Sequence, residues 1–540
     1  MAITRSTRRA SADVAGRARQ KHACWSPSRD ESLPACFRHV VVAALTLAFA
    51  GGVAPSHAQA WRMTPTFSFE STLTDNVNLS PNDQRKTDWV NQFTPTLRFS
   101  EHGAHSQFAG NIALPILLYA RTSENNYVAP TVDISGNAEL IEKLLFVDAS
   151  ANVSQQYKTP FGPVPNNLAN ATNNRYTAQS YTISPYLRGF LANNIDYEVR
   201  DSNLWSVANG VGELSGNEYT NDFTSHVTRR PLPIGWSLSY ERTALQFHDQ
   251  PSERLQIARA NALYRADPAV ELSASLGYED NELQFSEERG VTYGVGVTWH
   301  PTDRTNVEAK LEHRFFGASY NLLFDHRTPL SVWSVRASRD ITNYPSQLAA
   351  LPAGSNVSLF LNSLLLSKVP DPGQRQSLID QIIRERGLPT QLTGPVTLVS
   401  QQVILVETAT ATFGILGARN SVLFTVYHTR NEPVEGSVLS NVGGVLSSVN
   451  NNTQNGVGAV WTHQLAGQLT LATMADWSRS TDNVEPHVST RLATIRTVLS
   501  TALSPYTSVY ASARFQDSRT NVFGSYREMA VLVGASYIFH

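Results

Sequence analysis

Four charged residues of alternating sign stand two positions apart in one short segment of the chain. They are Glu308, Lys310, Glu312 and Arg314. In an extended strand this spacing places all four side chains on one face. Two carboxylates on one face could act as the acid and base of a hydrolase, whereas alternating opposite charges can neutralise each other along the wall of a wet lumen. We interpret the four as candidate lumen-wall residues and expect no catalytic residue among them.

Motifs for other chemistry are missing from the sequence. There is no G-x-S-x-G nucleophile elbow and no H-E-x-x-H metal motif, and the 14 histidines are scattered. Asp75, Asn76 and Asn78 could offer oxygen ligands to calcium, but the segment lacks the glycine and the terminal glutamate of a complete calcium loop. Asx residues also shape turns through local backbone bonds. We expect no metal, no other cofactor and no enzymatic activity.

Composition excludes further classes of protein. Both cysteines, Cys24 and Cys36, lie in the first 60 residues, so a chain that begins at Trp61 has no disulfide or thiol chemistry. Removing the eight Lys or Arg and three Asp or Glu of residues 1–60 from the totals of 43 and 45 leaves 35 and 42, a net charge near −7. A nucleic-acid-binding surface is basic, so we expect no nucleic-acid partner.

The first 60 residues have the organisation of an export signal. An unusually long basic region, from Arg5 to Arg38, precedes an apolar stretch at 40–52, and Ala58-Gln59-Ala60 forms an A-x-A cleavage site. The apolar stretch, of about 13 residues, is shorter than the ~20 that a transmembrane helix needs. We expect residues 1–60 to be a signal peptide that is cleaved after Ala60.

Apolar and polar residues alternate through most of residues 61–540. One segment carries the apolar or aromatic residues Val291, Tyr293, Val295, Val297 and Trp299 at every second position, with Thr292, Gly294, Gly296, Thr298 and His300 between them. Segments of about ten residues with this period are typical of transmembrane β-strands. Only helices and closed barrels satisfy every backbone group in lipid, and no segment of 61–540 resembles a transmembrane helix. The pattern therefore predicts a barrel.

Connection lengths support the same fold. We count about 22 segments, within a range of about 18 to 24. Connections after even-numbered segments are short, as at 102–105 and 301–304, and those after odd-numbered segments are longer, as at 76–87 and 159–175. Outer-membrane barrels have short periplasmic turns and long external loops. We expect an all-β, large antiparallel transmembrane β-barrel over 61–540, in contact with bacterial outer-membrane lipid and with both termini periplasmic.

The last strand carries a recognisable ending. Gly534-x-x-Tyr537-x-Phe539 resembles part of the terminal signal that the bacterial outer-membrane barrel assembly machinery reads. The final strand of a soluble sandwich is the alternative interpretation of this segment taken alone. We expect Gly534, Tyr537 and Phe539 to act as the barrel-assembly signal, with the assembly machinery as a partner.

A long insert at 342–399 interrupts the alternation. Asn356 can cap one helix, and Asp371-Pro372 can begin a second. Loops of this length are usually functional or disordered. We expect the two helices to fold into or over the mouth of the barrel; the alternative is a surface hairpin that packs on its own loops. The candidate pore-constriction residues are Phe360, Leu364, Arg375, Leu378, Ile382 and Arg384.

Short motifs carry a family resemblance. S-T-L-T-D-N-V-N-L at 71–79, D-W-V at 88–90 and T-P-T-L at 94–97 together resemble the PEP-CTERM system-associated outer-membrane protein family, which is encoded in exosortase and exopolysaccharide loci. P-D-P-G-x-R at 370–375 and R-G-L-P at 386–389 resemble that family's helical insert. The resemblance implies an outer-membrane barrel tied to polysaccharide secretion, with secretion proteins as partners and no catalytic residue.

Three functions follow from these patterns. The expected inner wall mixes acidic and basic residues, which suits a neutral polar solute such as a sugar chain, and equally a water-filled wall without specific cargo. The first hypothesis is a channel or export component of an exopolysaccharide or PEP-CTERM system. The alternative is a non-conducting structural or interaction barrel that anchors a surface-assembly complex. A barrel hydrolase is the third.

Overall fold

A computed structural model describes most of residues 61–539. The described residues are 61–192, 194–209, 217–247, 251–354, 357, 361, 365, 375, 378, 379, 394–396, 402–434, 450–485, 487–522 and 524–539. The strands are β1 (Arg62–Thr74), β2 (Asp88–His102), β3 (Ser106–Ala113), β4 (Ile116–Tyr119), β5 (Tyr127–Val128), β6 (Thr131–Ile141), β7 (Leu145–Tyr157), β8 (Arg175–Ala192), β9 (Ile195–Asn209), β10 (Asn217–Arg229), β11 (Ile234–Gln246), β12 (Glu253–Asp267), β13 (Val270–Glu282), β14 (Glu287–Thr302), β15 (Thr305–Arg314), β16 (Gly317–Arg327), β17 (Ser331–Thr342), β18 (Ile404–Leu416), β19 (Asn420–Pro433), β20 (Asn452–Gln464), β21 (Leu469–Asp482), β22 (Ser489–Ala502), β23 (Thr507–Thr520) and β24 (Tyr526–Ile538).

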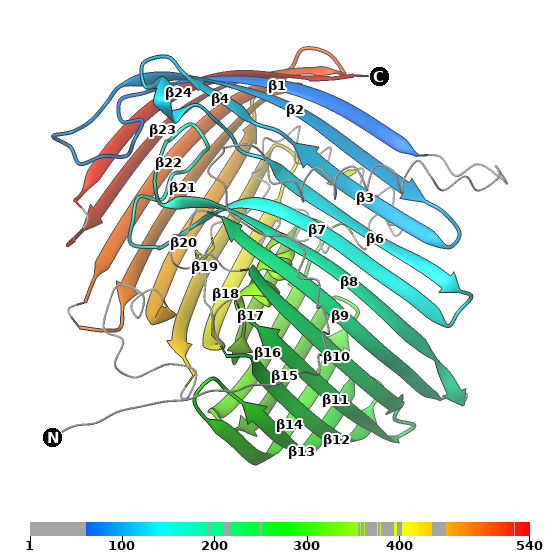
Figure 1. The fold of residues 1–540 in the computed structure, drawn as a ribbon. Helices are drawn as coiled ribbons and strands as arrows, with labels where there is room; N and C mark the ends of the chain where they lie inside the picture. Colours follow the sequence, from blue (N-terminus) through cyan, green and yellow to red (C-terminus); the bar gives the residue numbers. More distant parts are fainter. Residues whose placement is uncertain are drawn as a thin grey trace, which may run out of the picture. The chain divides into compact units, whose positions relative to one another are not determined.

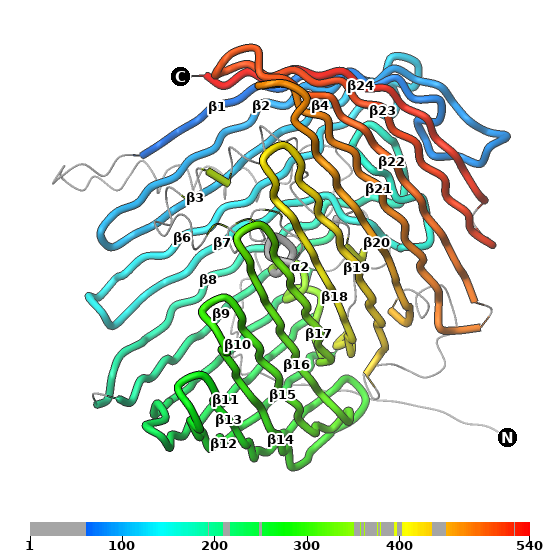
Figure 2. The backbone as a smooth tube through the Cα atoms, turned by 180° about the vertical axis from the view of Figure 1, so that it is seen from behind, coloured from blue at the N-terminus to red at the C-terminus, as the bar shows by residue number. Residues whose placement is uncertain are grey.

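These strands form one antiparallel sheet that closes on itself. Neighbours in sequence pair as hairpins, and β1 pairs with β24 from Thr66 opposite Ile538 to Thr74 opposite Ala530. Figure 1 shows the first and last strands side by side, and Figure 2 follows the hairpins from behind. Closure leaves no open sheet edge, which is the condition for a sheet in lipid.

The wall of the barrel has 22 strands. The sheet contains 24 strand segments, but β4 continues β3 beyond Pro115, and the two-residue β5 precedes β6 across Pro130. β2 pairs with both β3 and β4. Proline has no amide hydrogen to donate to the ladder, and these two breaks fall beside Pro115 and Pro130. Counting each broken pair once gives 22, the number that the alternation predicted.

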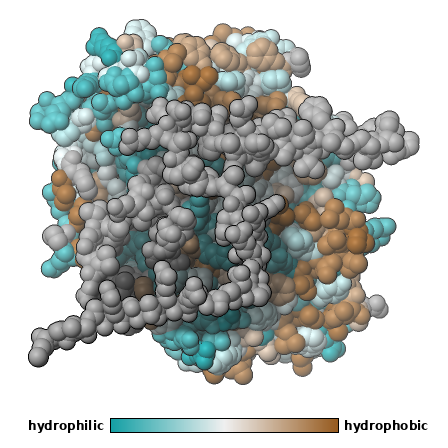
Figure 3. Space-filling model, viewed as in Figure 1, coloured by the Kyte–Doolittle hydropathy of each residue, from teal (hydrophilic) through white to brown (hydrophobic). Residues whose placement is uncertain are grey.

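The apolar face of the sheet is its exposed face. In β24, Met529, Val531 and Val533 are 62%, 57% and 52% exposed, whereas Glu528 and Leu532 on the other face are 0% and 1% exposed. A soluble sandwich buries its apolar face, so this inverted arrangement requires an apolar surrounding. Figure 3 shows hydrophobic residues gathered on the outer surface. Seven of the exposed residues are tryptophans: Trp61, Trp89, Trp205, Trp299, Trp333, Trp461 and Trp477.

Connections differ between the two ends of the barrel. The short-turn end has tight links such as 142–144, 230–233 and 303–304, and the long-loop end has 75–87, 158–174 and 343–403. The predicted separation of short turns from long loops is present. Two links at the long-loop end are short, namely 283–286 between β13 and β14 and Phe315-Phe316 between β15 and β16. Asn76 shapes the first long loop as expected, because its side chain bonds the backbone of Ser80 in both directions at 2.8 and 2.9 Å.

Helix is scarce in the described part of the chain. A 3-10 turn η1 (Ser123–Asn125) lies between β4 and β5, and α2 (Tyr344–Gly354) follows β17. The Asn343 side chain accepts a hydrogen bond of 2.9 Å from the backbone N–H of Ser346. This bond caps the amino end of α2. The sequence did not predict α2, and the predicted helix start at Asn356 lies outside the described residues. No described helix is both long and apolar enough to cross a membrane.

Candidate functional site

Three of the four predicted lumen-wall residues, Lys310, Glu312 and Arg314, form ion pairs on the inner face. Glu312 is buried. Its carboxylate accepts a hydrogen bond of 2.8 Å from Arg259 Nε and lies 3.3 Å from Lys310 Nζ. Arg259 reaches from β12 to β15 because Gly277 and Gly294 carry no side chains on the strands between. A Cβ at Gly277 would lie 3.1 Å from Arg259 Cγ. Opposite charges therefore neutralise each other along this part of the wall.

Arg314 and Glu308 complete the predicted set. Arg314 is buried, and its guanidinium lies 3.2 Å from a Glu279 oxygen and 2.6 Å from an Asp340 oxygen. Glu308 is exposed and accepts a bond from the Asn306 amide at 2.9 Å. Among the described residues, no group of three or more His, Cys, Asp or Glu is arranged to hold a metal.

Loop 158–174 lies against the inner face of β22 to β24. Arg514 and Glu528 are fully buried beneath it, with Arg514 Nη2 2.7 Å from Glu528 Oε1. The side chain of Asn170 in the loop donates a hydrogen bond of 2.7 Å to Glu528 and accepts one of 2.9 Å from Arg514. Breaking such a pair by removing one partner is costly, because a buried charge stays uncompensated. This polar network, here called the latch, holds the loop to the wall.

Further bonds fix the loop along its length. Thr490 Oγ1 donates to the Phe161 carbonyl at 3.1 Å, and Gln516 Nε2 donates to the Val164 carbonyl at 2.7 Å. Asn174 donates to the carbonyls of Thr159 and Pro163 at 2.9 and 3.1 Å. The loop is therefore a hydrogen-bonded unit that occupies part of the lumen.

Helix α2 crosses from β17 toward another part of the wall. The hydroxyls of Tyr344 and Tyr176 lie 2.9 Å apart, and Leu348 packs in the same cluster with Ala178 and Ala208. Tyr176 and Ala178 belong to β8, nine strands away from β17 in the 22-strand wall. Burial raises the pKa of Tyr344, so its hydroxyl stays protonated. The start of the insert thus bridges the lumen at the long-loop end.

The next part of the insert packs on an apolar row of the inner wall. Val357, Leu361, Leu365, Leu378 and Ile379 have helical backbone, and they contact wall residues of β17 to β21. Leu416 of β18 is one of these wall residues, and the other four, here called the docking row, are Val332, Leu423, Val460 and Met474. Val332 and Leu423 both pair with Gly414, Leu423 pairs with Val460, and Val460 with Met474, so the row runs across five neighbouring strands.

The docking row lies toward the short-turn end, because Val332 is the second residue of β17 and Leu423 the fourth of β19. The insert leaves β17 at the opposite end, so it must run along the lumen to reach the row. Val357, Leu361 and Ile379 are fully buried there. Burying a side chain of this kind contributes roughly 1.5–3 kcal/mol relative to exposure. Without the insert, the apolar residues of the docking row would be exposed to water in an open lumen.

The predicted constriction residues fall partly within this contact. Leu378 packs against the cluster of the docking row, and Arg375 is buried. Phe360, Leu364, Ile382 and Arg384 lie outside the described residues. Farther along the insert, Val396 and the Gln454 amide exchange two hydrogen bonds of 2.9 and 3.1 Å. The chain then returns to the long-loop end at Val403, which donates to Glu253 at 3.3 Å.

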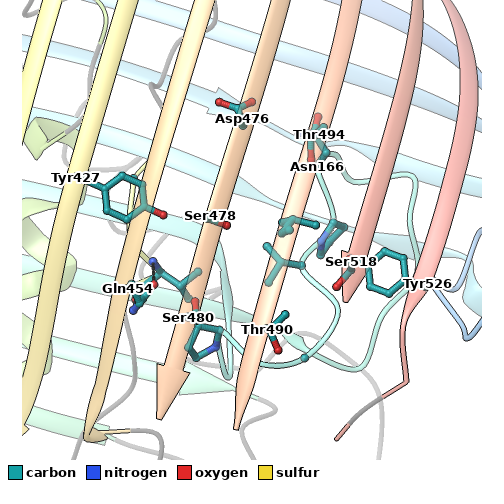
Figure 4. A pocket seen from close by; sticks show the side chains of 17 residues that line it. Asn166, Tyr427, Gln454, Asp476, Ser478, Ser480, Thr490, Thr494, Ser518 and Tyr526 are labelled. Atoms are coloured by element: carbon teal, nitrogen blue, oxygen red, sulfur yellow. Dashed lines mark hydrogen bonds between the residues drawn. The ribbon is translucent and has the colours of Figure 1, made fainter. Parts of the chain in front are cut away.

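A cavity of about 240 Å³ lies between loop 158–174, the insert at 394–396 and the wall of β19 to β24. Its floor follows one row of paired residues across six strands, which Figure 4 shows in part. The row consists of Tyr427, Gly456, Ser478, Leu492, Ser518 and Tyr526. Asp476, Ser480, Thr490 and Thr494 border the row, and Pro160, Asn166 and Val396 contribute from the loops. Both inward-folded segments border the cavity, and its lining mixes hydroxyl groups with apolar surface.

The proposed assembly signal lies at the short-turn end of the wall. Tyr537 and Phe539 are exposed on the outer face, with ring centroids 4.9 Å apart in an edge-to-face arrangement. Gly534 leaves room for the Tyr510 ring, because a Cβ there would lie 2.4 Å from a ring carbon. An outward aromatic pair at a strand end can be read from outside the barrel.

Sequence reasoning missed the latch and the docking row. Arg514 and Glu528 lie on inward positions of β23 and β24, but their loop partner Asn170 is 344 residues from Arg514. The docking row had a signal: Leu423 stands between Val422 and Phe424, and Val460 beside Trp461, so apolar residues there occupy both faces. A strand that is apolar on both faces is buried on both.

The closed antiparallel sheet, its apolar exterior and its polar lumen define the chain as an outer-membrane β-barrel. No protein-family model matches the chain, and no curated protein matches it.

Solved structures with similar folds include an iron transporter and a siderophore receptor. The FrpB iron transporter from Neisseria meningitidis is 7% identical, with a TM-score of 0.47 over 89% of this chain and 83% of that one. The siderophore receptor PirA from Pseudomonas aeruginosa is 9% identical, with a TM-score of 0.44 over 90% and 81%. OpdQ from Pseudomonas aeruginosa is 10% identical, with a TM-score of 0.32 over 89% and 100%.

Proposed function

We propose that this barrel is an outer-membrane channel or export component whose lumen is narrowed by the insert at 343–403. The observation that carries the proposal is the docking of Leu361 and its helical neighbours on the docking row. A barrel of this size without lumen contents forms an aqueous passage. In the described part of the insert, contacts with the wall involve side chains of the docking row and of Gln454, so the insert can leave the row without unfolding a strand.

Conductance in planar bilayers tests this function. Replacing residues 356–387 by a short Gly-Ser linker should raise the single-channel conductance several-fold over that of the full chain. A second variant, Leu361→Ser with Leu365→Ser, keeps the chain length. Its channel should open more often than that of the full chain, because the insert docks less tightly. Heat-modifiable gel migration checks that each variant forms a closed barrel. Folded variants that conduct no better than the full chain would refute the channel.

We further propose that the cargo is a polysaccharide and that the barrel serves an exosortase-linked (PEP-CTERM) system. Its support is the resemblance of the motifs at 71–79, 88–90 and 94–97 to that family, together with a lumen wall that carries both signs of charge. Secretion proteins would then be partners at the periplasmic side. Loss of surface polysaccharide on deletion of the gene, restored by the full chain, would support this cargo; unchanged polysaccharide would exclude it.

A non-conducting anchor is the second candidate function. The observation in its favour is that α2, the docked insert and loop 158–174 all contact the inner wall at once. An anchor predicts no conductance steps from the full chain or from the insert-deleted variant. It also predicts that the barrel co-purifies with its complex after mild extraction.

A further inference from the structure

Four arginines face outward at the long-loop end of β21 to β24, strands that lie side by side in Figure 1. Arg479 of β21 pairs with Arg491 of β22, and Arg491 pairs with Arg519 of β23. Arg527 of β24 is the fourth, and all four are exposed. Residues that stand directly opposite each other have Cβ atoms about 4.5–5.5 Å apart, and like charges in such pairs are destabilising. This set, here called the arginine row, therefore favours an anion that offsets its charge.

The protein itself offsets little of that charge. Asp517 lies 2.9 Å from Arg519 Nε and 2.7 Å from Arg527 Nε, so two members of the arginine row share one carboxylate. Arg479 and Arg491 form no ion pair with any residue that the structure describes. Four positive charges and the one negative charge of Asp517 leave a net charge of +3 on this surface.

The outer surface of β12 to β14 at the same end of the barrel carries charges that are balanced. Arg254 is paired with Glu282, and Arg289 lies 2.7 Å from an Asp280 oxygen and 3.2 Å from a Glu287 oxygen. Arg254 stands directly opposite Glu282, and Arg289 stands directly opposite Asp280. Unbalanced positive charge is therefore a feature of β21 to β24 that β12 to β14 do not share.

The arginine row borders the apolar outer surface of the barrel. On the outward face, Trp477 stands two residues from Arg479 and Met529 stands two residues from Arg527, and both apolar side chains are exposed. A strand rises about 3.3 Å per residue, so each of these arginines lies about 7 Å beyond an apolar side chain. Tryptophan is enriched at the interface between membrane and water. The row therefore lies at the level of lipid head groups, on the side where outer-membrane barrels have long external loops.

A phosphate group fits such a row. Guanidinium groups bind phosphate through two parallel hydrogen bonds, and a phosphate ester offers three acceptor oxygens and about two negative charges. One phosphate can therefore bridge Arg479 and Arg491. A lipid also places its acyl chains on the apolar side chains beside the row, a contact that a soluble anion lacks. The outer leaflet of bacterial outer membranes is rich in phosphorylated glycolipid, which supplies both parts.

We propose that the arginine row binds the phosphate groups of a phosphorylated glycolipid in the outer leaflet, with Arg479 and Arg491 as the main phosphate partners. Trp477 and Ile495, which are exposed on the same face, lie beside the acyl chains. The bound lipid offsets the opposition of like charges between β21, β22 and β23. This site is on the outer surface of the barrel, so it does not depend on the proposed channel.

Native mass spectrometry of the full chain in neutral detergent tests the lipid site. The probes are lipid A, a glycolipid with phosphate on its sugars, phosphatidylcholine, whose head group has no net charge, and inorganic phosphate, which has no acyl chain. Lipid A should bind, and it should raise the temperature at which the gel migration of the barrel changes. Arg479→Gln with Arg491→Gln should weaken the binding of lipid A about tenfold or more, because charge-assisted bonds to phosphate are lost.

A charge-matched variant is the control. Arg254→Gln with Arg289→Gln removes the same charge from β12 to β14 and should change the binding of lipid A by less than about threefold. Without lipid, the variant of the arginine row should unfold at the same temperature as the full chain or a higher one, because it relieves an opposition of like charges.

Four results would overturn the proposal. They are absence of lipid A binding by the full chain, equal binding of lipid A by the two double variants, binding of phosphatidylcholine as strong as that of lipid A, and stabilisation by inorganic phosphate as large as that by lipid A. Neither readout requires conduction, so a failure of the lipid site and a failure of the channel are distinguishable.

Discussion

Loop 158–174 and the insert at 343–403 both fold onto the inner wall, but different forces hold them. The loop is fixed by buried polar groups, foremost the pair of Arg514 and Glu528 with Asn170. The insert is fixed mainly by apolar side chains on the docking row. Buried ion pairs demand good geometry, and they fail sharply when one member is removed. Apolar contacts are non-directional and scale with buried area.

This difference assigns different roles to the two segments. A loop held by directed bonds has one well-defined position and is suited to form a permanent wall of the cavity. A segment held by apolar contacts can slide or leave with a graded loss of free energy. We therefore expect loop 158–174 to be a fixed part of the lumen and the insert to be its removable part.

The largest expected effect comes from breaking the latch. Arg514→Ala should destabilise the closed position of loop 158–174 by about 3–5 kcal/mol, because the buried carboxylate of Glu528 loses its charged partner and keeps hydrogen bonds from the neutral side chains of Thr74 and Asn170. Hydrogen exchange of residues 158–174 measures the loss of protection. Arg519→Ala, which removes an exposed partner of Asp517 on the same strand, should cost no more than about 1 kcal/mol. Equal protection in both variants would contradict the latch.

A second test weakens the docking row. Leu423→Ala should reduce docking of the insert by about 2–5 kcal/mol, the usual cost of emptying a buried leucine site. Hydrogen exchange at Leu361 and Leu365 and the frequency of channel openings should both increase. Phe424→Ala, on the same strand but facing outward at 40% exposure, is the matched control and should leave docking unchanged. If Phe424→Ala releases the insert as readily as Leu423→Ala does, the effect comes from destabilisation of the whole barrel.

The smallest expected effect concerns α2. Tyr176→Phe removes the hydroxyl that meets Tyr344 and should weaken α2 by about 0.5–1.5 kcal/mol, seen as faster exchange in residues 346–354. Tyr181→Phe removes a hydroxyl bond to Gln179 on the same strand without touching Tyr344. A larger loss from Tyr181→Phe than from Tyr176→Phe would mean that the tyrosine pair does not hold the helix.

The wall was predictable from the sequence, because period-two alternation marks each strand and prolines such as Pro115 mark its breaks. Helix α2 was not, since Pro352 and Gly354 in its last turn are poor helix formers. It forms where Asn343 caps it and Tyr344 finds Tyr176. The latch joins Asn170 to β23 and β24, a proximity that only closure of the barrel creates.

Photo-crosslinking from position 361 tests the central claim most directly, namely that the insert lies inside the lumen on the docking row. A benzophenone side chain replaces Leu361, the folded barrel is irradiated in lipid, and the crosslinked peptides are identified by mass spectrometry. The account predicts crosslinks to the inward residues Leu423 and Val460 and their neighbours on β19 and β20. Crosslinks confined to the loops of the long-loop end, with none to the inner wall, would contradict it.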